Sequence, residues 1–179
     1  MDYLIHHMLR RSFQLFPDKE ALVHGNERLS YREVFRRTAS LASSLVRLGI
    51  KRGERVGIYL DASVPQVLSM FSISMSGAVY VPINSVLFPN QVLHIANDCA
   101  ISALIVSRDK LESLLPVLDQ APSIRFLIVV SEEPIPKMGR EAYLFSDLTG
   151  AQDWAVPPDR GISKDLAAIL YTSGSTGRP

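Results

Sequence analysis

A run of six small residues near the end of the chain has the composition of an anion-binding loop. It extends from Thr172 to Gly177, follows the apolar run "DLAAILY", and carries four hydroxyl groups. Glycines let backbone N–H groups turn toward an anion, and hydroxyls add donors that can follow the oxygens of a polyphosphate. Open α/β sheets bind ligands at the carboxyl ends of their strands, which is where this loop would lie. The pattern indicates phosphate binding, and composition alone leaves a plain surface turn as the alternative.

Two common nucleotide-binding motifs do not describe this loop. The Walker motif needs two glycines five positions apart, followed by a lysine and a hydroxyl residue, and the dinucleotide fingerprint needs a different glycine spacing. Here Gly174 and Gly177 are three positions apart, and Arg178 and Pro179 follow them. A more specific signal than glycine content is therefore required.

The four histidines are predicted to be non-catalytic, and no metal site is expected. His6 and His7 are adjacent, so they should face different sides of a helix. His24 and His94 lack a metal-ligating partner at a useful spacing.

Three further polar residues and the single cysteine are interpreted as structural. Tyr31 and Glu33 fit helix capping and packing better than acid–base chemistry, and Asn84 would orient a loop. Cys99 lies among apolar residues and has no disulfide partner in the chain, which fits a buried thiol in a reducing compartment. Among these residues we therefore expect no catalytic side chain.

The elements before the loop alternate between apolar strands and helices. Strands without polar alternation, separated by helices, predict an α/β fold with a largely parallel sheet flanked by helices. The predicted strands are "RVGIYL", "AVYVPIN", "ALIVS", "RFLIVV" and "DLAAILYT", and the predicted helices between them are "VPQVLSMFSISMSG", "PNQVLHIANDC" and "DKLESLLPVLDQ". Pro116 should end or kink the last of these helices.

The N-terminal part and one late tract have different patterns. Apolar residues recur at helical spacing from Leu4 to Phe13, which predicts an amphipathic helix, and "ALVHG" with "RLSY" predicts a hairpin. Ser30 and Glu33 have the spacing of a capping box before a helix that ends at Gly49. Residues 131–164 show no sustained period and are predicted to be irregular.

Composition excludes several classes of function. The 179 residues are 47% hydrophobic and 21% charged, as in a folded globular protein, and the formal charge is +1. No basic block supports nucleic-acid binding, and no apolar segment approaches the roughly 20 residues of a membrane span. The N-terminus does not have the pattern of a signal peptide, so a cytoplasmic location is expected.

The order of residues in the loop closely resembles the phosphate-binding signature of the adenylate-forming, AMP-binding enzymes. "ILYTSGSTGRP" follows that signature through Pro179, where the family has a lysine next. "LSYREV", "GERVGIYL" and "SGAVYVPIN" resemble upstream family motifs in the same order, so the resemblance covers nearly the whole chain. Ala100 departs from it, because many members have glycine at this helix end.

The resemblance implies activation of a carboxylic acid by ATP, giving an acyl adenylate and pyrophosphate, and then usually transfer to coenzyme A or a carrier thiol. It implies ATP, Mg²⁺ and coenzyme A as cofactors, a small-molecule acid as substrate, and a place in fatty acid metabolism. The residues implied to hold the β- and γ-phosphates are Thr172, Ser173, Gly174, Ser175, Thr176 and Gly177.

Residues 1–179 are expected to form part of the N-terminal AMP-binding domain of an acyl-CoA synthetase-like fold, truncated within the phosphate loop. The fragment alone is expected to be inactive, because the family's remaining subdomains and its C-terminal domain would follow. Two alternatives are a fragment of a peptide-synthetase adenylation domain and a free-standing interaction module. The surface exposed by truncation could then support a homodimer.

Overall fold

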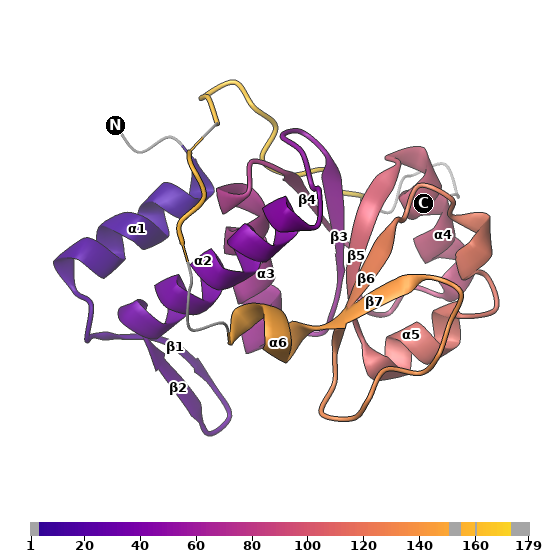
Figure 1. Cartoon of the computed structure of the whole chain (residues 1–179), viewed down its shortest axis with the longest axis horizontal. Coiled ribbons are helices and arrows are strands. Elements are labelled where there is room, and N and C mark those ends of the chain that lie inside the picture. Colours follow the sequence, from indigo (N-terminus) through magenta and orange to yellow (C-terminus); the bar gives the residue numbers. More distant parts are fainter. Residues whose placement is uncertain (1–3, 151–154, 160, 173–179) are drawn as a thin grey trace.

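The computed structural model describes residues 4–150, 155–159 and 161–172. These residues form a five-stranded, wholly parallel sheet in the order β4-β3-β5-β6-β7 (Figure 1). The strands are β3 (Arg55–Tyr59), β4 (Val79–Pro82), β5 (Ile101–Ser107), β6 (Phe126–Val130) and β7 (Glu141–Leu144). The predicted α/β class and parallel sheet are confirmed.

Helices cover both faces of this sheet, so the domain has three layers (Figure 1). One layer contains α2 (Tyr31–Arg47), α3 (Val64–Met75) and α6 (Phe145–Thr149), and the other contains α4 (Pro89–Asp98) and α5 (Arg108–Leu114). Successive residues of a strand point to opposite faces. Ile105 accordingly packs with the first layer, whereas Leu104 and Val106 pack with the second. This explains why the strands are apolar without alternation.

Local capping signals set the helix boundaries as predicted. Ser30 Oγ accepts a hydrogen bond from the Glu33 N–H at 3.3 Å, and Glu33 Oε2 accepts one from the Ser30 N–H at 2.8 Å. Gly49 and Gly77 follow α2 and α3 with φ values of +84° and +82°, which only glycine adopts readily. The α5 helix ends at Leu114, before Pro116, and a 3₁₀ turn (Leu118–Gln120) follows.

The N-terminal prediction is also confirmed. The α1 helix (Ile5–Leu15) precedes a hairpin of β1 (Glu20–His24) and β2 (Glu27–Ser30). Phe13 on α1 stacks on Phe35 of α2, with ring centroids 4.5 Å apart. The helix is therefore docked on the first helical layer.

The prediction of an irregular tract over residues 131–164 is wrong in part, because β7 and α6 lie within it. These elements have four and five residues, which is too short to give a recognisable period. β7 is an edge strand paired only with β6 in the described part of the chain, and none of its four residues is fully buried. Ser40 on α2 fixes α6 by donating a hydrogen bond to the Leu148 carbonyl at 2.8 Å.

The predicted strand "DLAAILYT" is wrong as well. Only one bridge forms there, between Ala168 and Tyr80 of β4. Leu166 and Leu170 have 67% and 70% of their surface exposed, because in the described residues nothing covers the outer side of this segment. An apolar run predicts a strand only where neighbours bury both of its faces.

Candidate functional site at the carboxyl edge of the sheet

Polar side chains gather where β3, β4 and β5 end. Because these strands are parallel, their carboxyl ends meet at one edge of the sheet, the usual ligand edge of open α/β sheets. Lys110, just after β5, forms an ion pair with Asp61, just after β3, at 2.6 Å. The Lys110 ammonium also lies 5.3 Å from the centre of the Tyr59 ring. These contacts join the segments that follow β3 and β5.

The pKa values of Tyr59 and Asp61 are shifted in opposite directions at this edge. Burial raises the pKa of Tyr59, and Asp109 and Asp61 raise it further, so the phenol stays protonated. Its hydroxyl donates to the Leu87 carbonyl at 2.7 Å and holds the loop after β4. The hydrogen bond from Lys110 lowers the pKa of Asp61, which is therefore a carboxylate at neutral pH.

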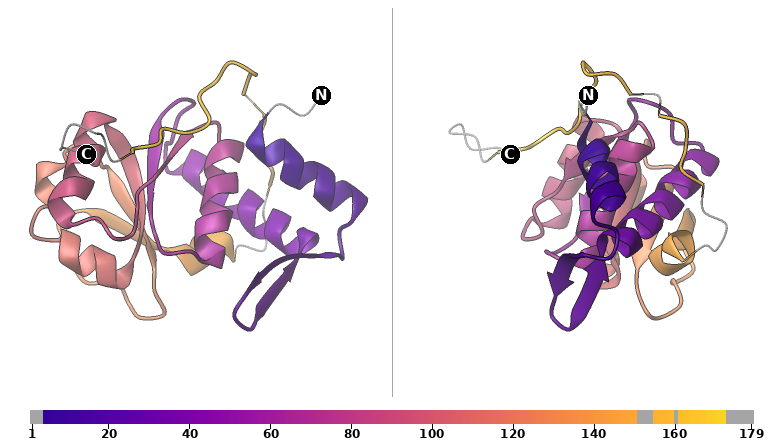
Figure 2. Two further views of the ribbon diagram at one scale, coloured as in Figure 1. Left: turned by 180° about the vertical axis from the view of Figure 1, so that it is seen from behind. Right: turned by 90° about the vertical axis from the view of Figure 1, so that its left-hand side faces the viewer.

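A strap made of residues 155–159 and 161–172 lies at the opposite, amino edge of the sheet, because its partner Arg52 precedes β3 and its partner Asp98 precedes β5. It runs from beside α1, passes β4 and continues toward α4 (Figure 2). The Tyr80 N–H donates to the Ala167 carbonyl at 3.2 Å, and the Ile169 N–H donates to the Tyr80 carbonyl at 3.1 Å. The bridge is parallel, so the strap follows the direction of β4 for a short stretch before it reaches the C-terminal end of α4.

Tyr171 anchors the end of the strap. Its hydroxyl donates to the carboxylate of Asp98, the last residue of α4. Burial raises the pKa of Tyr171, and the hydrogen bond to Asp98 adds to the effect, so this phenol also remains protonated. Tyr171, which directly precedes the predicted phosphate loop, is thereby held against the C-terminal end of α4.

The predicted phosphate-binding residues are placed only in part. Thr172 is exposed beside Tyr171. Ser173, Gly174, Ser175, Thr176 and Gly177 lie outside the described residues. The described end of the strap lies beside the C-terminal end of α4, so the expected position of the loop at the carboxyl edge, where Asp61 and Lys110 lie, is wrong for Thr172.

A second anchor holds the middle of the strap. Arg52 donates two hydrogen bonds to Asp165, at 2.9 and 2.6 Å, in the bidentate arrangement that guanidinium and carboxylate favour. The Ile162 N–H also donates to Asp165, at 3.0 Å. Arg52 chiefly lowers the pKa of Asp165, so the carboxylate is charged under ordinary conditions.

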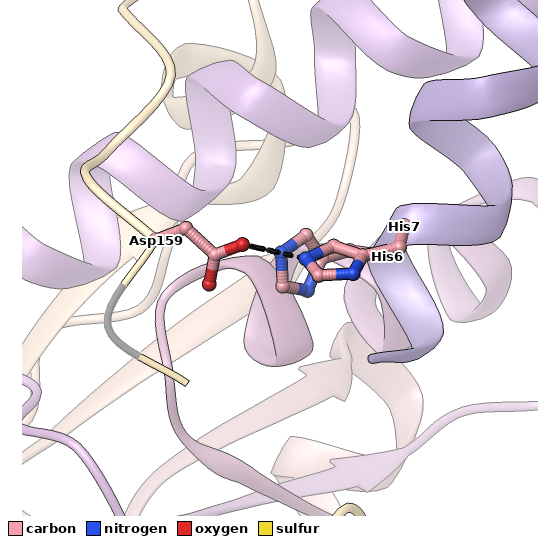
Figure 3. A group of neighbouring side chains, drawn as sticks. All are labelled: His6, His7 and Asp159. Atoms are coloured by element: carbon pink, nitrogen blue, oxygen red, sulfur yellow. Dashed lines mark hydrogen bonds and ion pairs between the residues drawn. The ribbon is translucent and has the colours of Figure 1, made fainter. Parts of the chain in front are cut away.

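A third contact joins the strap to α1, and it corrects the prediction for the N-terminal histidines. His6 and His7 do not face separate surroundings: both rings are buried and both approach Asp159 (Figure 3). His7 Nε2 lies 2.5 Å from Asp159 Oδ2, and His6 Nε2 lies 3.7 Å from the same oxygen. Both histidines can reach Asp159 because they lie in the first turn of α1, at the end of the helix nearest the strap.

The other sequence candidates have structural roles. His24 and His94 are exposed on separate elements, Tyr31 packs against the core, and Asn84 Oδ1 accepts from the Val86 N–H at 3.2 Å. Cys99 is half-buried rather than buried, and burial raises the pKa of its thiol. None of these residues carries the candidate site.

Sequence patterns did not identify Asp98 or Asp159. Asp98 is the last residue of a helix, and Asp159 belongs to the tract without periodicity. The pair of Asp61 and Lys110 had a usable signal, because each residue closely follows a buried strand and parallel strands end together. A search for charged residues just after strands would have found it.

The family described as "AMP-binding enzyme" matches residues 9–179, and the chain belongs to it. Its relatives include N-(5-amino-5-carboxypentanoyl)-L-cysteinyl-D-valine synthase of Amycolatopsis lactamdurans, 34% identical over 168 residues, covering 91% of this chain and 4% of the relative. They also include a medium/long-chain-fatty-acid–CoA/3-oxocholest-4-en-26-oate–CoA ligase of Mycobacterium marinum (strain ATCC BAA-535 / M). It is 27% identical over 168 residues, which cover 91% of this chain and 30% of that relative.

Solved structures agree with this membership. The anthranilate CoA ligase AuaEII in complex with anthranoyl-AMP is 27% identical and has a TM-score of 0.85, covering 100% of this chain and 34% of that one. The chain thus spans about a third or less of these three proteins. No helix in the described ranges is long and apolar enough to cross a membrane.

Proposed function

We propose that this chain is the N-terminal part of an AMP-forming acid–thiol ligase. The whole enzyme would activate a carboxylic acid with ATP and Mg²⁺ to an acyl adenylate, release pyrophosphate, and transfer the acyl group to coenzyme A. The observation that carries the proposal is the match of residues 9–179 to the AMP-binding family. Within that range, the order of residues from Tyr171 to Gly177 resembles the phosphate-binding signature of the family.

The loop would position phosphates and would not supply a nucleophile. Backbone N–H groups and hydroxyls would hold the β- and γ-phosphates of ATP while the substrate carboxylate attacks the α-phosphorus, and pyrophosphate would leave. Positioning and neutralisation of charge provide most of the catalysis in such transfers. The residues assigned to this role are Thr172, Ser173, Gly174, Ser175, Thr176 and Gly177.

The acyl acceptor is the finer part of the proposal. Coenzyme A is supported by the likeness to AuaEII over the whole of this chain and by the M. marinum relative, whose name includes fatty acids and supports a role in fatty acid metabolism. A fragment of a peptide-synthetase adenylation domain is the second candidate, because relatives include tyrocidine synthase 1 of Brevibacillus parabrevis at 26% identity. Both candidates share the adenylation step.

Product analysis separates the two candidates. The full-length polypeptide that contains this chain is incubated with ATP, Mg²⁺, coenzyme A and a panel of carboxylic acids, and the products are analysed by mass spectrometry. We expect an acyl-CoA that forms only with ATP present. An acyl adenylate without acyl-CoA, together with acylation of a carrier protein, would overturn the assignment of coenzyme A but leave adenylation intact.

A further inference from the structure

The contact between α1 and the strap combines three side chains that ligate metals elsewhere in proteins. One imidazole nitrogen each from His6 and His7 and one carboxylate oxygen from Asp159 lie within 4.8 Å of one another. Imidazole nitrogen with a carboxylate oxygen is a donor set suited to Zn²⁺ and related ions, whereas Mg²⁺ favours oxygen ligands. Figure 3 shows both rings on one side of the Asp159 carboxyl group.

The spacing of these atoms is close to that of a tetrahedral site. Bonds of about 2.0–2.1 Å to a tetrahedral metal place ligand atoms about 3.3 Å apart. The distance from His6 Nε2 to Asp159 Oδ2 is 3.7 Å. His7 Nε2 lies 2.5 Å from the same oxygen, in a direct hydrogen bond, so this pair would separate by about 1 Å to admit an ion. Asp159 belongs to the strap, where no helix or sheet fixes its backbone.

Hydrogen bonds outside the cluster orient two of the three ligands. His6 Nδ1 lies 3.0 Å from Ser74 Oγ on α3, which leaves Nε2 directed at Asp159. The Gly161 N–H donates to Asp159 Oδ1 at 3.3 Å, while Oδ2 faces the rings. Such outer contacts are typical of metal-ligating histidines and carboxylates.

The positive charge of Arg10 opposes metal binding, so its removal is predicted to change the metal affinity in a defined direction. Arg10 Nη1 lies 3.9 Å from Asp159 Oδ2, the same oxygen that both histidines approach. A second cation beside this carboxylate is repelled by the guanidinium. Removing the Arg10 charge should therefore strengthen metal binding, whereas it should weaken a contact that needs only to hold Asp159 in place.

We propose that His6, His7 and Asp159 bind one divalent transition-metal ion, Zn²⁺ by preference, which clamps α1 to the strap. Bonds from His7 Nε2 and Asp159 to the ion would replace the hydrogen bond between these two groups, and the proton of that hydrogen bond would be displaced. Water completes the coordination. The ion would reinforce the strap upstream of the phosphate loop without taking part in adenylation.

The test is calorimetric titration of the 179-residue chain with zinc sulfate at pH 7.5, with thermal melts alongside. We expect one ion per chain and, at a hundredfold excess over the dissociation constant, a rise in Tm of about 5–10 °C. Cobalt(II) should give the visible absorption of a tetrahedral site, and magnesium chloride should give no binding. Absence of zinc binding by the wild-type chain overturns the proposal.

Variants assign the ion to this site. His7→Gln and Asp159→Asn should weaken zinc binding at least about tenfold, the range seen even for outer-shell changes. Arg10→Gln should tighten it, and this variant keeps all three ligands if the others fold poorly. The matched control is His24→Gln with His94→Gln, which removes both exposed histidines and should leave binding unchanged. Loss of binding in that control, or weaker binding in Arg10→Gln, contradicts the assignment.

Discussion

Ala100 occupies a backbone conformation that alanine adopts poorly. It follows α4 and Cys99 with φ = +47°, the left-handed region in which helices commonly end at glycine. Arg55 compensates in part, because its guanidinium donates to the Cys99 carbonyl at 2.5 Å and to the Ala100 carbonyl at 3.0 Å. The departure from the family's glycine thus falls at a strained helix end.

We predict that Ala100→Gly stabilises the chain. Relief of the left-handed strain is worth about 1–2 kcal/mol, and the extra freedom of glycine in the unfolded chain offsets part of it. The expected gain in the free energy of unfolding is about 0.5–1 kcal/mol, measured by urea denaturation. Gly53→Ala, at φ = +78° with open space around it, is the opposite control and should destabilise. A loss of stability in Ala100→Gly would show that Arg55 already removes the strain.

His6 makes stability depend on pH in the mildly acidic range. Its pKa falls from 6.5 in the unfolded chain to about 4 in the fold through burial, with Asp159 opposing the shift and His7 and Arg10 adding to it. Between these values the unfolded chain binds the proton and the folded chain does not, so stability is full above pH 6.5 and is lost as the pH falls toward 4.

The loss attributable to His6 reaches about 3 kcal/mol at pH 4. Urea titrations from pH 7.5 to pH 4 measure it, with metal removed by a chelator. In His6→Gln this part of the slope should disappear. An unchanged slope in the variant would show that other groups cause the acid sensitivity.

The strap is the element that connects the sheet and its helices to the predicted phosphate loop. In the described part of the chain its strand-like pairing is limited to one bridge with Tyr80, so side chains fix its path at Asp159, Asp165 and Tyr171. These partners come from α1, from the turn before β3 and from α4. These partners cannot be predicted from the order of the strands, because each contact joins residues that are far apart in the sequence.

We predict that Tyr171→Phe loosens the start of the phosphate loop. The change removes a hydrogen bond to a carboxylate, which is typically worth about 1.5–3 kcal/mol, and the partly exposed setting favours the lower value. In the full-length enzyme of the proposed function, KM for ATP should rise several-fold with a smaller change in kcat. Tyr143→Phe is the matched control, because its hydroxyl bonds to Glu141 on the opposite edge of the sheet. Equal effects of the two changes would show a general loss of stability.

Elements with strong local signals could be predicted from the sequence, and elements that depend on neighbours could not. The Ser30 and Glu33 capping box and the glycines after α2 and α3 mark boundaries within a few residues. The strand β7 depends on pairing with β6, and the "DLAAILYT" segment lacks the cover that would make it a strand. The candidate site follows the same division, because the loop has a recognisable order of residues whereas its anchors are long-range contacts.

At the scale of the whole molecule, this chain is predicted to supply only the phosphate loop of the proposed ATP site. Ordering six loop residues costs roughly 6–12 kcal/mol in backbone entropy. Three or four hydrogen bonds to charged phosphate return about 5–12 kcal/mol, so the two sums nearly cancel. The rest of the nucleotide would have to be bound by parts of the enzyme beyond this chain.

We therefore predict that the isolated 179-residue chain binds Mg²⁺-ATP more weakly than about 1 mM, for which the binding free energy is about 4 kcal/mol. Calorimetric titration at low ionic strength measures the affinity. A dissociation constant in the micromolar range would contradict this prediction and would favour a free-standing nucleotide-binding module.

We propose that the loop from Thr172 to Gly177 positions ATP for adenylation. The most direct measurement is carboxylate-dependent exchange of labelled pyrophosphate into ATP by the full-length enzyme. Thr176→Ala should lower the exchange rate about 10- to 100-fold, the equivalent of one lost hydrogen bond to a charged group, while Ser43→Ala on α2 leaves it unchanged. Unaltered exchange in Thr176→Ala, or no exchange by the wild-type enzyme with any acid tested, would contradict the account.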